Sequence, residues 1–242
     1  MSIYEHLWYI VETEPLTSTN SRIAQYILLN YRNIEDIRLD DIAYGSHVVK
    51  STVSKFFKGM TENGSYDSFL SAIDVDKKDM NIRNKENKKY LNADIIEKKE
   101  LKILSESIQE ASRVLFFSKD IYIPCLKKFC RKLIDSGIVG KPSAYFYKES
   151  IRKEILSLDE NDCVIFVDLE KSFYEYILRL GFEIDFFSII NDSKCKKLNL
   201  TKEEEKVSGV RTICLGNNTD VTELTYLYEI FDDVLINIKK SK

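Results

Sequence analysis

Lysines and small hydroxyl side chains gather in residues 42–61, and neither aspartate nor glutamate occurs among them. Acidic residues stand just outside this stretch, at Asp40, Asp41 and Glu62. A carboxylate repels a phosphate backbone and an ammonium group attracts it, so this composition suits contact with a nucleic acid. The candidate DNA-binding residues are Lys50, Ser51, Thr52, Ser54, Lys55 and Lys58.

The apolar residues of the same stretch predict two short helices joined by a tight turn at residues 45–47. In the second helix the apolar residues recur at i, i+3, i+4 and i+7, as Val53, Phe56, Phe57 and Met60. This leaves Lys50, Ser51, Ser54, Lys55 and Lys58 on the outward face, as in a recognition helix that enters the major groove. We expect Lys55 and Lys58 at phosphates, and Lys50, Ser51, Thr52 and Ser54 nearest the base edges. An ordinary amphipathic helix with a solvated basic face is the alternative.

The flanking residues add a family resemblance over about residues 1–75. The motifs that carry it are Leu16-Thr17, Ile23-Ala24-x-Tyr26-Ile27, Ile42-Ala43 and Thr52-Val53-Ser54-Lys55-Phe56. Together they resemble the N-terminal helix-turn-helix domain of RpiR/MurR-type bacterial transcriptional regulators. This chain departs from that family where Lys55 replaces an arginine, which removes a bidentate donor. It departs again where Val49 replaces the serine that would cap the second helix.

The length and composition of the whole chain fit a globular protein with one large domain or two smaller ones. It has 242 residues, 44% of them hydrophobic, and a formal net charge of −3. Since it lacks a run of about 20 apolar residues and a signal-peptide pattern, we expect a cytoplasmic protein without membrane contact. The five widely spaced cysteines are expected to be buried thiols. A metal site at Cys125 and Cys130 is not expected, because no further Cys or His ligand lies near them in sequence. No cofactor is expected either.

The order of predicted elements divides the chain into three parts. An all-α domain at 1–75 precedes a charged, Asn-rich linker at 76–93 and an α/β domain at 94–242. In the last part the predicted strands are 114–117, 144–147, 163–167, 184–190 and 210–215. The predicted helices between and around them are 94–111, 124–136, 149–158, 172–180 and 222–239. Such alternation predicts a parallel sheet covered by helices on both faces, a three-layer fold.

The second half resembles a SIS domain, the sugar-isomerase type of α/β module that follows the helix-turn-helix in RpiR regulators. The resemblance rests on the order of elements, on the helix ending at residues 131–137 and on Asp162 at the start of the third strand. In that family, a glycine-rich loop after the first strand and a serine-rich loop after the third hold a sugar phosphate. Neither loop is present here. The corresponding positions offer Ser118, Asp120, Asp168 and Ser172 as candidate effector-binding residues, and the two aspartates would repel a phosphate.

Two interpretations of the second domain stay open: a dimerisation body without a ligand, or a changed pocket for an uncharged or cationic effector. The leading functional hypothesis is a DNA-binding transcriptional regulator that acts as a homodimer, which the resemblance links to genes of carbohydrate metabolism. A SIS-type sugar-phosphate isomerase is the alternative enzyme, and it is disfavoured because no histidine follows His47. A scaffold that keeps the helix-turn-helix without binding DNA is the third hypothesis.

Overall fold

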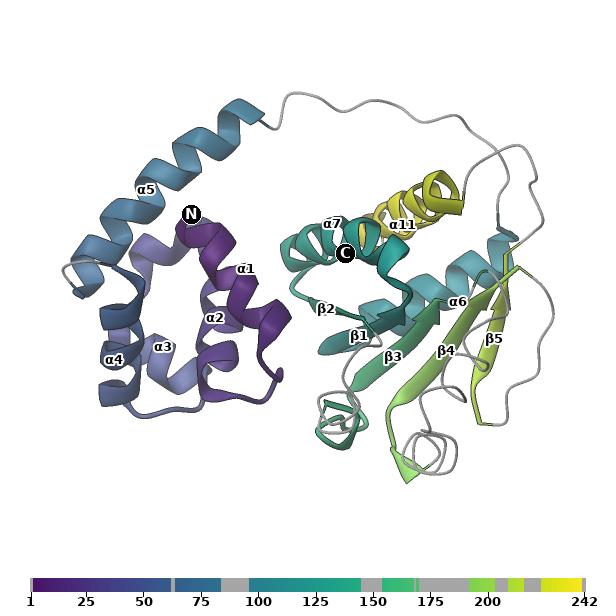
Figure 1. The fold of residues 1–242 in the computed structure, drawn as a ribbon, viewed down its shortest axis with the longest axis horizontal. Coiled ribbons are helices and arrows are strands. Elements are labelled where there is room, and N and C mark those ends of the chain that lie inside the picture. Colours follow the sequence, from purple (N-terminus) through teal and green to yellow (C-terminus); the bar gives the residue numbers. More distant parts are fainter. Residues whose placement is uncertain are drawn as a thin grey trace. The chain divides into compact units, whose positions relative to one another are not determined.

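The computed structural model describes residues 2–61, 64–83, 96–144, 154–167, 169, 192–202, 209–215 and 223–240 (Figure 1). Contacts along the chain divide it into two compact units, residues 1–90 and 91–242. Across the described ranges, every helix is too short or too polar to span a lipid bilayer.

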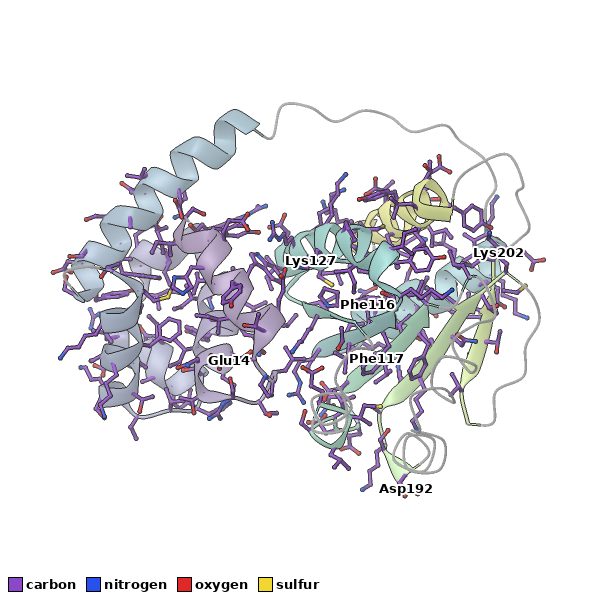
Figure 2. The ribbon with its side chains drawn as sticks, viewed as in Figure 1. Glu14, Phe116, Phe117, Lys127, Asp192 and Lys202 are labelled. Atoms are coloured by element: carbon purple, nitrogen blue, oxygen red, sulfur yellow. The ribbon has the colours of Figure 1, made fainter. Side chains whose placement is uncertain are left out.

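The first unit is built entirely of helices. They are α1 (Ile3–Thr13), α2 (Thr19–Leu29), the 3-10 helix η1 (Tyr31–Asp36), α3 (Leu39–Gly45), α4 (Lys50–Met60) and α5 (Tyr66–Arg83). Ser2 and Ser18 cap α1 and α2 by accepting hydrogen bonds from the backbone N–H groups three residues on. Glu14, labelled in Figure 2, secures the connection by accepting from the Ser18 hydroxyl at 2.6 Å. Trp8 is 1% exposed and belongs to the core of this unit.

Helix α5 closes the first unit and extends further along the chain than the predicted closing helix at residues 66–73. The Tyr66 hydroxyl donates to the carbonyl oxygens of Ile37 and Ile34 at 2.6 and 3.2 Å, and burial raises the pKa of Tyr66 to about 12. Almost three turns further along α5, Asp76 accepts a hydrogen bond from the backbone N–H of Tyr4 at 3.0 Å. Residues 76–83 of the expected linker are therefore a continuation of α5, and residues 84–95 lie outside the described part of the chain.

The second unit contains a five-stranded parallel sheet. Its strands are β1 (Arg113–Ser118), β2 (Val139–Ala144), β3 (Asp162–Val167), β4 (Lys196–Thr201) and β5 (Arg211–Cys214), in the order β2-β1-β3-β4-β5. The helices are α6 (Lys98–Gln109), α7 (Ile123–Leu133) and α11 (Glu223–Lys240), with the 3-10 helices η2 (Asp120–Tyr122) and η3 (Ile134–Ser136) at either end of α7. The predicted fold class, a helical N-terminal part followed by a parallel α/β part, is confirmed.

One face of the sheet is covered by helices α7 and α11. Phe116 of β1 contacts Phe129 of α7 and Phe231 of α11, with ring centroids 5.7 and 6.0 Å apart. The neighbouring Phe117 points to the opposite face, where its ring stacks on Phe166 of β3 at 5.6 Å (Figure 2). The predicted helix at 172–180 and the predicted strand at 184–190 lie outside the described residues, as do residues 149–153 of the predicted helix at 149–158.

The predicted start of the second strand was wrong, and residues 145–147 of that prediction lie outside the described part of the chain. Strand β2 begins at Val139, whereas residues 144–147 were predicted. The sequence Gly140-Lys141-Pro142 looks like a turn, yet β2 lies at one edge of the described sheet, where a proline costs no ladder hydrogen bond. Gly140 is needed there because a Cβ would lie 2.7 Å from the Cys130 sulfur of α7. Strand β4 was missed, since only Leu198 and Leu200 mark its apolar face.

A buried ion pair ties β2 to the segment before β3. Lys141 and Glu154 form a salt bridge although their side chains are only 4% and 3% exposed. Burial raises the pKa of Glu154, and the Lys141 charge opposes that rise. Each member of such a pair depends on the other, because a single buried charge without its partner is strongly destabilising.

We expect Lys141→Met to lower the free energy of unfolding by about 3–5 kcal/mol at neutral pH. Without Lys141 the folded-state pKa of Glu154 rises further above its ordinary value of 4.5. The loss relative to the parent protein should therefore be small below that ordinary pKa and grow as the pH increases through the folded-state pKa. Denaturant unfolding at several pH values measures it. The double variant Lys141→Met/Glu154→Leu should recover most of the loss, and a pH-independent loss would contradict this account.

Candidate nucleic-acid interface

The turn between α3 and α4 is set by backbone hydrogen bonds of one defined pattern. The N–H of His47 donates to the carbonyl oxygen of Tyr44 at 3.1 Å, and the N–H of Val48 donates to that of Ala43 at 2.9 Å. This is a Schellman motif, which ends a helix with a residue in the left-handed region. His47 occupies that position with φ 54°. The side chain of His47 is exposed, as expected for a surface residue.

Gly45 allows helix α2 to pack tightly against this turn. A Cβ at Gly45 would lie 1.9 Å from Cε2 of Tyr26, so the Tyr26 ring occupies the space that any other residue would need. Tyr26 belongs to α2, and the contact therefore fixes the end of α3 against a third helix. The turn that leads from α3 into α4 is thus held against α2 because Gly45 has no side chain.

Helix α4 buries one face and exposes the other. Val53, Phe56 and Phe57 are buried, and the Phe57 ring lies 4.5 Å from that of Phe69 in α5. Met60, the last residue of the predicted apolar stripe, is half-buried. On the outward side Lys50, Ser51, Lys55 and Lys58 are exposed, and Thr52 and Ser54 are half-buried. The structure therefore brings all six candidate DNA-binding residues together on one helix.

Two of these six side chains already have partners in the structure. Lys50 Nζ lies 2.8 Å from a carboxylate oxygen of Asp40 in the first turn of α3, with both side chains more than half exposed. An exposed pair of this kind contributes at most about 1 kcal/mol, so a phosphate can replace Asp40 as the partner of Lys50. The Ser54 hydroxyl donates to the carbonyl oxygen of Lys50 at 3.1 Å, and it must rotate away before it can donate to a base edge.

The amino end of α4 begins without a side-chain cap. Val49 has the extended backbone of an N-cap, with φ −81° and ψ 149°, but no side-chain oxygen to accept from the N–H groups of the first turn. The first turn also contains no acidic residue. The partial positive charge of the helix amino end therefore stays uncompensated within α4, beside Lys50, and this favours an approaching anion.

Ser118, one of the four candidate effector residues, lies at the carboxyl end of β1, which is paired with β3. These adjacent strands are the switch point of the sheet, because the chain runs from β1 outward to β2 and then to β3 on the other side. Ser118 ends β1 opposite Val167, is fully buried, and its hydroxyl donates to the carbonyl oxygen of Lys119 at 3.1 Å. The side chain of Asp120 and the whole of Asp168 and Ser172 lie outside the described residues, so this site stays a prediction.

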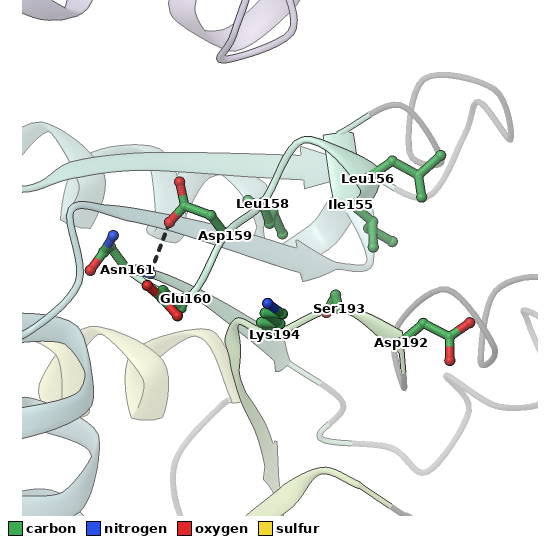
Figure 3. Close-up of a pocket in the computed structure, with 9 residues that line it drawn as sticks. All are labelled: Ile155, Leu156, Leu158, Asp159, Glu160, Asn161, Asp192, Ser193 and Lys194. Atoms are coloured by element: carbon green, nitrogen blue, oxygen red, sulfur yellow. Dashed lines mark hydrogen bonds between the residues drawn. The ribbon is translucent and has the colours of Figure 1, made fainter.

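A hollow of about 540 Å³ lies at the opposite, amino ends of β3 and β4 (Figure 3). Leu156, Asp159, Asp192 and Lys194 are among its lining residues. Asp159 accepts a hydrogen bond from the N–H of Asn161 at 2.8 Å, drawn as a dashed line in Figure 3. No pattern in the sequence predicts this hollow, since its wall combines two segments about 30 residues apart.

Comparison with known proteins finds neither a matching family model nor a matching curated protein. Solved structures are similar to this chain at low identity. The Vibrio vulnificus NanR protein complexed with ManNAc-6P is 16% identical, covers 99% of this chain and 92% of its own, and has a TM-score of 0.45. The sugar isomerase domain of an RpiR transcription factor from Sphaerobacter thermophilus is 12% identical, covers 61% and 81%, and also has a TM-score of 0.45.

A third similar structure comes from an enzyme. The C-terminal domain of glucosamine-fructose-6-phosphate aminotransferase from Francisella tularensis is 11% identical, covers 82% of this chain and 50% of its own, and has a TM-score of 0.41. Regulators and enzymes thus both occur among the similar structures. At these identities and TM-scores the likenesses assign no activity, ligand or partner to this chain.

We expect His47→Gly to raise the free energy of unfolding by about 1 kcal/mol, because glycine adopts the left-handed backbone without the steric cost that histidine has there. The midpoint of thermal or denaturant unfolding measures the gain. His47→Ala is the matched control, since alanine keeps that cost and should give no comparable gain. Equal stability of the glycine variant and the parent would show that the turn is not strained.

Proposed function

We propose that this chain is a sequence-specific DNA-binding transcriptional regulator of the RpiR type, and that α4 is its recognition helix. The observation that carries the proposal is the outward face of α4, which exposes three lysines and a serine while the aromatic inner face anchors the helix in its unit. The resemblance of residues 1–75 to the family's helix-turn-helix domain supports the same assignment.

The residues of α4 divide between two kinds of contact. Lys55 and Lys58 are exposed cations in the middle and last turn, suited to the phosphates that flank a major groove. Lys50, Ser51, Thr52 and Ser54 lie in the first half of the helix, which is the part that reaches base edges in helix-turn-helix proteins. Lysine at position 50 can donate to the O6 and N7 acceptors of guanine once it leaves Asp40.

The active species in this proposal is a homodimer. One recognition helix makes too few contacts for tight specific binding, and two copies on two half-sites double them. The second unit is the proposed dimerisation body, and the outer side of α11 is a candidate contact. The inner side of α11 is used within its own unit, where Leu227, Phe231 and Val234 are buried, while Ile236 is 48% exposed.

In this proposed role the chain catalyses no reaction. It acts in the cytoplasm and regulates genes of carbohydrate metabolism. An effector, if one binds, would enter at the carboxyl ends of β1 and β3, where such sheets hold their ligands. A sugar phosphate is not favoured there, because Asp120 and Asp168 replace the glycines and hydroxyls of the family's loops.

We expect Lys55→Ala to weaken binding to all DNA sequences alike and to reduce the slope of log affinity against log salt by about one for each bound chain. The reason is that an exposed lysine at a phosphate releases a counterion without reading a base. Gel shifts or fluorescence titrations at several salt concentrations measure both effects. Lys102→Ala on α6 is the matched control, since Lys102 is exposed and pairs only weakly with Glu106 at 3.6 Å.

Selection of bound duplexes from a random pool by the full chain would give the operator sequence. Repeating the selection with a panel of sugar phosphates tests the effector at the same time. Parent protein whose DNA affinity does not depend on salt would refute the proposal, as would full biological activity after all three lysines of α4 are replaced by glutamate. Turnover of an aldose or ketose phosphate would favour the isomerase instead.

A further inference from the structure

The two most exposed large apolar side chains of the described residues flank the turn of the helix-turn-helix. Tyr44, near the end of α3, is 85% exposed, and Val49, at the start of α4, is 67% exposed. Tyr44 has a hydroxyl group that water can satisfy, so its exposure needs no special explanation. The side chain of Val49 has no polar atom, and its exposure has no such compensation.

Val49 contributes little to the stability of the fold. It occupies the N-cap of α4, where valine is among the poorest residues because it offers no acceptor to the first-turn N–H groups. Its side chain also lies outside the core, whereas Val53 and Phe57 of α4 are buried in it. A serine, threonine or aspartate would serve the helix better on the same extended backbone.

The surroundings of Val49 limit what can cover it. Lys50 follows it directly, Ser51 is exposed, and α4 carries no carboxylate along its whole length. A protein partner without strong negative charge gains little from such a face, whereas a DNA groove matches its charge. The one apolar group that a major groove presents is the 5-methyl group of thymine, which aliphatic side chains contact.

We infer that Val49 reads a thymine in each operator half-site by packing its two methyl groups against the thymine 5-methyl group. This inference rests on the proposed function, since it requires the amino end of α4 to lie in a major groove. It adds a specificity-determining residue to the four polar ones proposed to reach base edges, and it gives the uncapped start of α4 a role in recognition.

The test uses the full-length chain and the duplex obtained by selection from the random pool. Each thymine of the half-site is replaced in turn by deoxyuridine, which removes only the 5-methyl group and keeps every hydrogen-bonding atom. At one position, the same in both half-sites, affinity should fall about fourfold for each half-site, as expected for one buried methyl group. Replacements elsewhere should have little effect.

Variants of Val49 separate recognition from stability. Val49→Ser should bind the thymine and deoxyuridine duplexes equally at that position, and Val49→Ala, which keeps one methyl group, should show a smaller preference for thymine than the parent. Val49→Ser should in addition raise the thermal unfolding midpoint, because serine caps α4, whereas Val49→Ala should not. Val75→Ala is the matched control: Val75 is 59% exposed on α5, outside the helix-turn-helix, and its variant should keep the thymine preference.

The outcomes distinguish the inference from the function on which it rests. The parent protein could bind DNA in a salt-dependent and sequence-specific way, yet with equal affinity for thymine and deoxyuridine at every position. That result would overturn the role of Val49 and leave the proposed function standing. An undiminished thymine preference in Val49→Ser would assign the methyl contact to another residue and equally overturn the inference. Absence of salt-dependent DNA binding would reject the proposed function and the inference together.

Discussion

The first unit depends on the packing of the aromatic face of α4. Phe57 meets Phe69 and Tyr66 of α5, with ring centroids 4.5 and 5.1 Å apart, and the Tyr66 hydroxyl holds the chain before α3. Because a helix with one face anchored cannot rotate about its axis, this packing decides which residues of α4 face outward. The lysines and hydroxyls at the surface are thus positioned by hydrophobic burial on the other side of the same helix.

Much of this arrangement is predictable from the sequence, and the reason is periodicity. Val53, Phe56 and Phe57 repeat at helical spacing, so the existence of α4 and its outward face follow from counting residues. In the same way, the buried run from Val114 to Phe117 marks β1, and Gly137 marks the end of the helix before β2 with φ 77°. Local signals of this kind do not depend on the rest of the fold.

The remaining features depend on contacts between distant residues, which no local pattern reveals. The strand of Gly140, Lys141 and Pro142 is recognisable only once its place at a sheet edge is known. The ion pair of Lys50 with Asp40 requires the Schellman turn to bring two helices together. Among the candidate effector residues, the burial of the Ser118 hydroxyl follows from neighbouring strands, and a polar side chain after a strand looks the same in sequence whether buried or open.

The composition of β2 also has a consequence for assembly. A further strand that paired with this edge would lack an N–H donor at Pro142. It would also lie beside Lys141, whose ammonium group is buried in the ion pair with Glu154. Edges of this kind resist extension by another molecule, and β5, at the other edge of the described sheet, has only four residues to offer. Self-association through a continuous intermolecular sheet is therefore disfavoured at these two described edges.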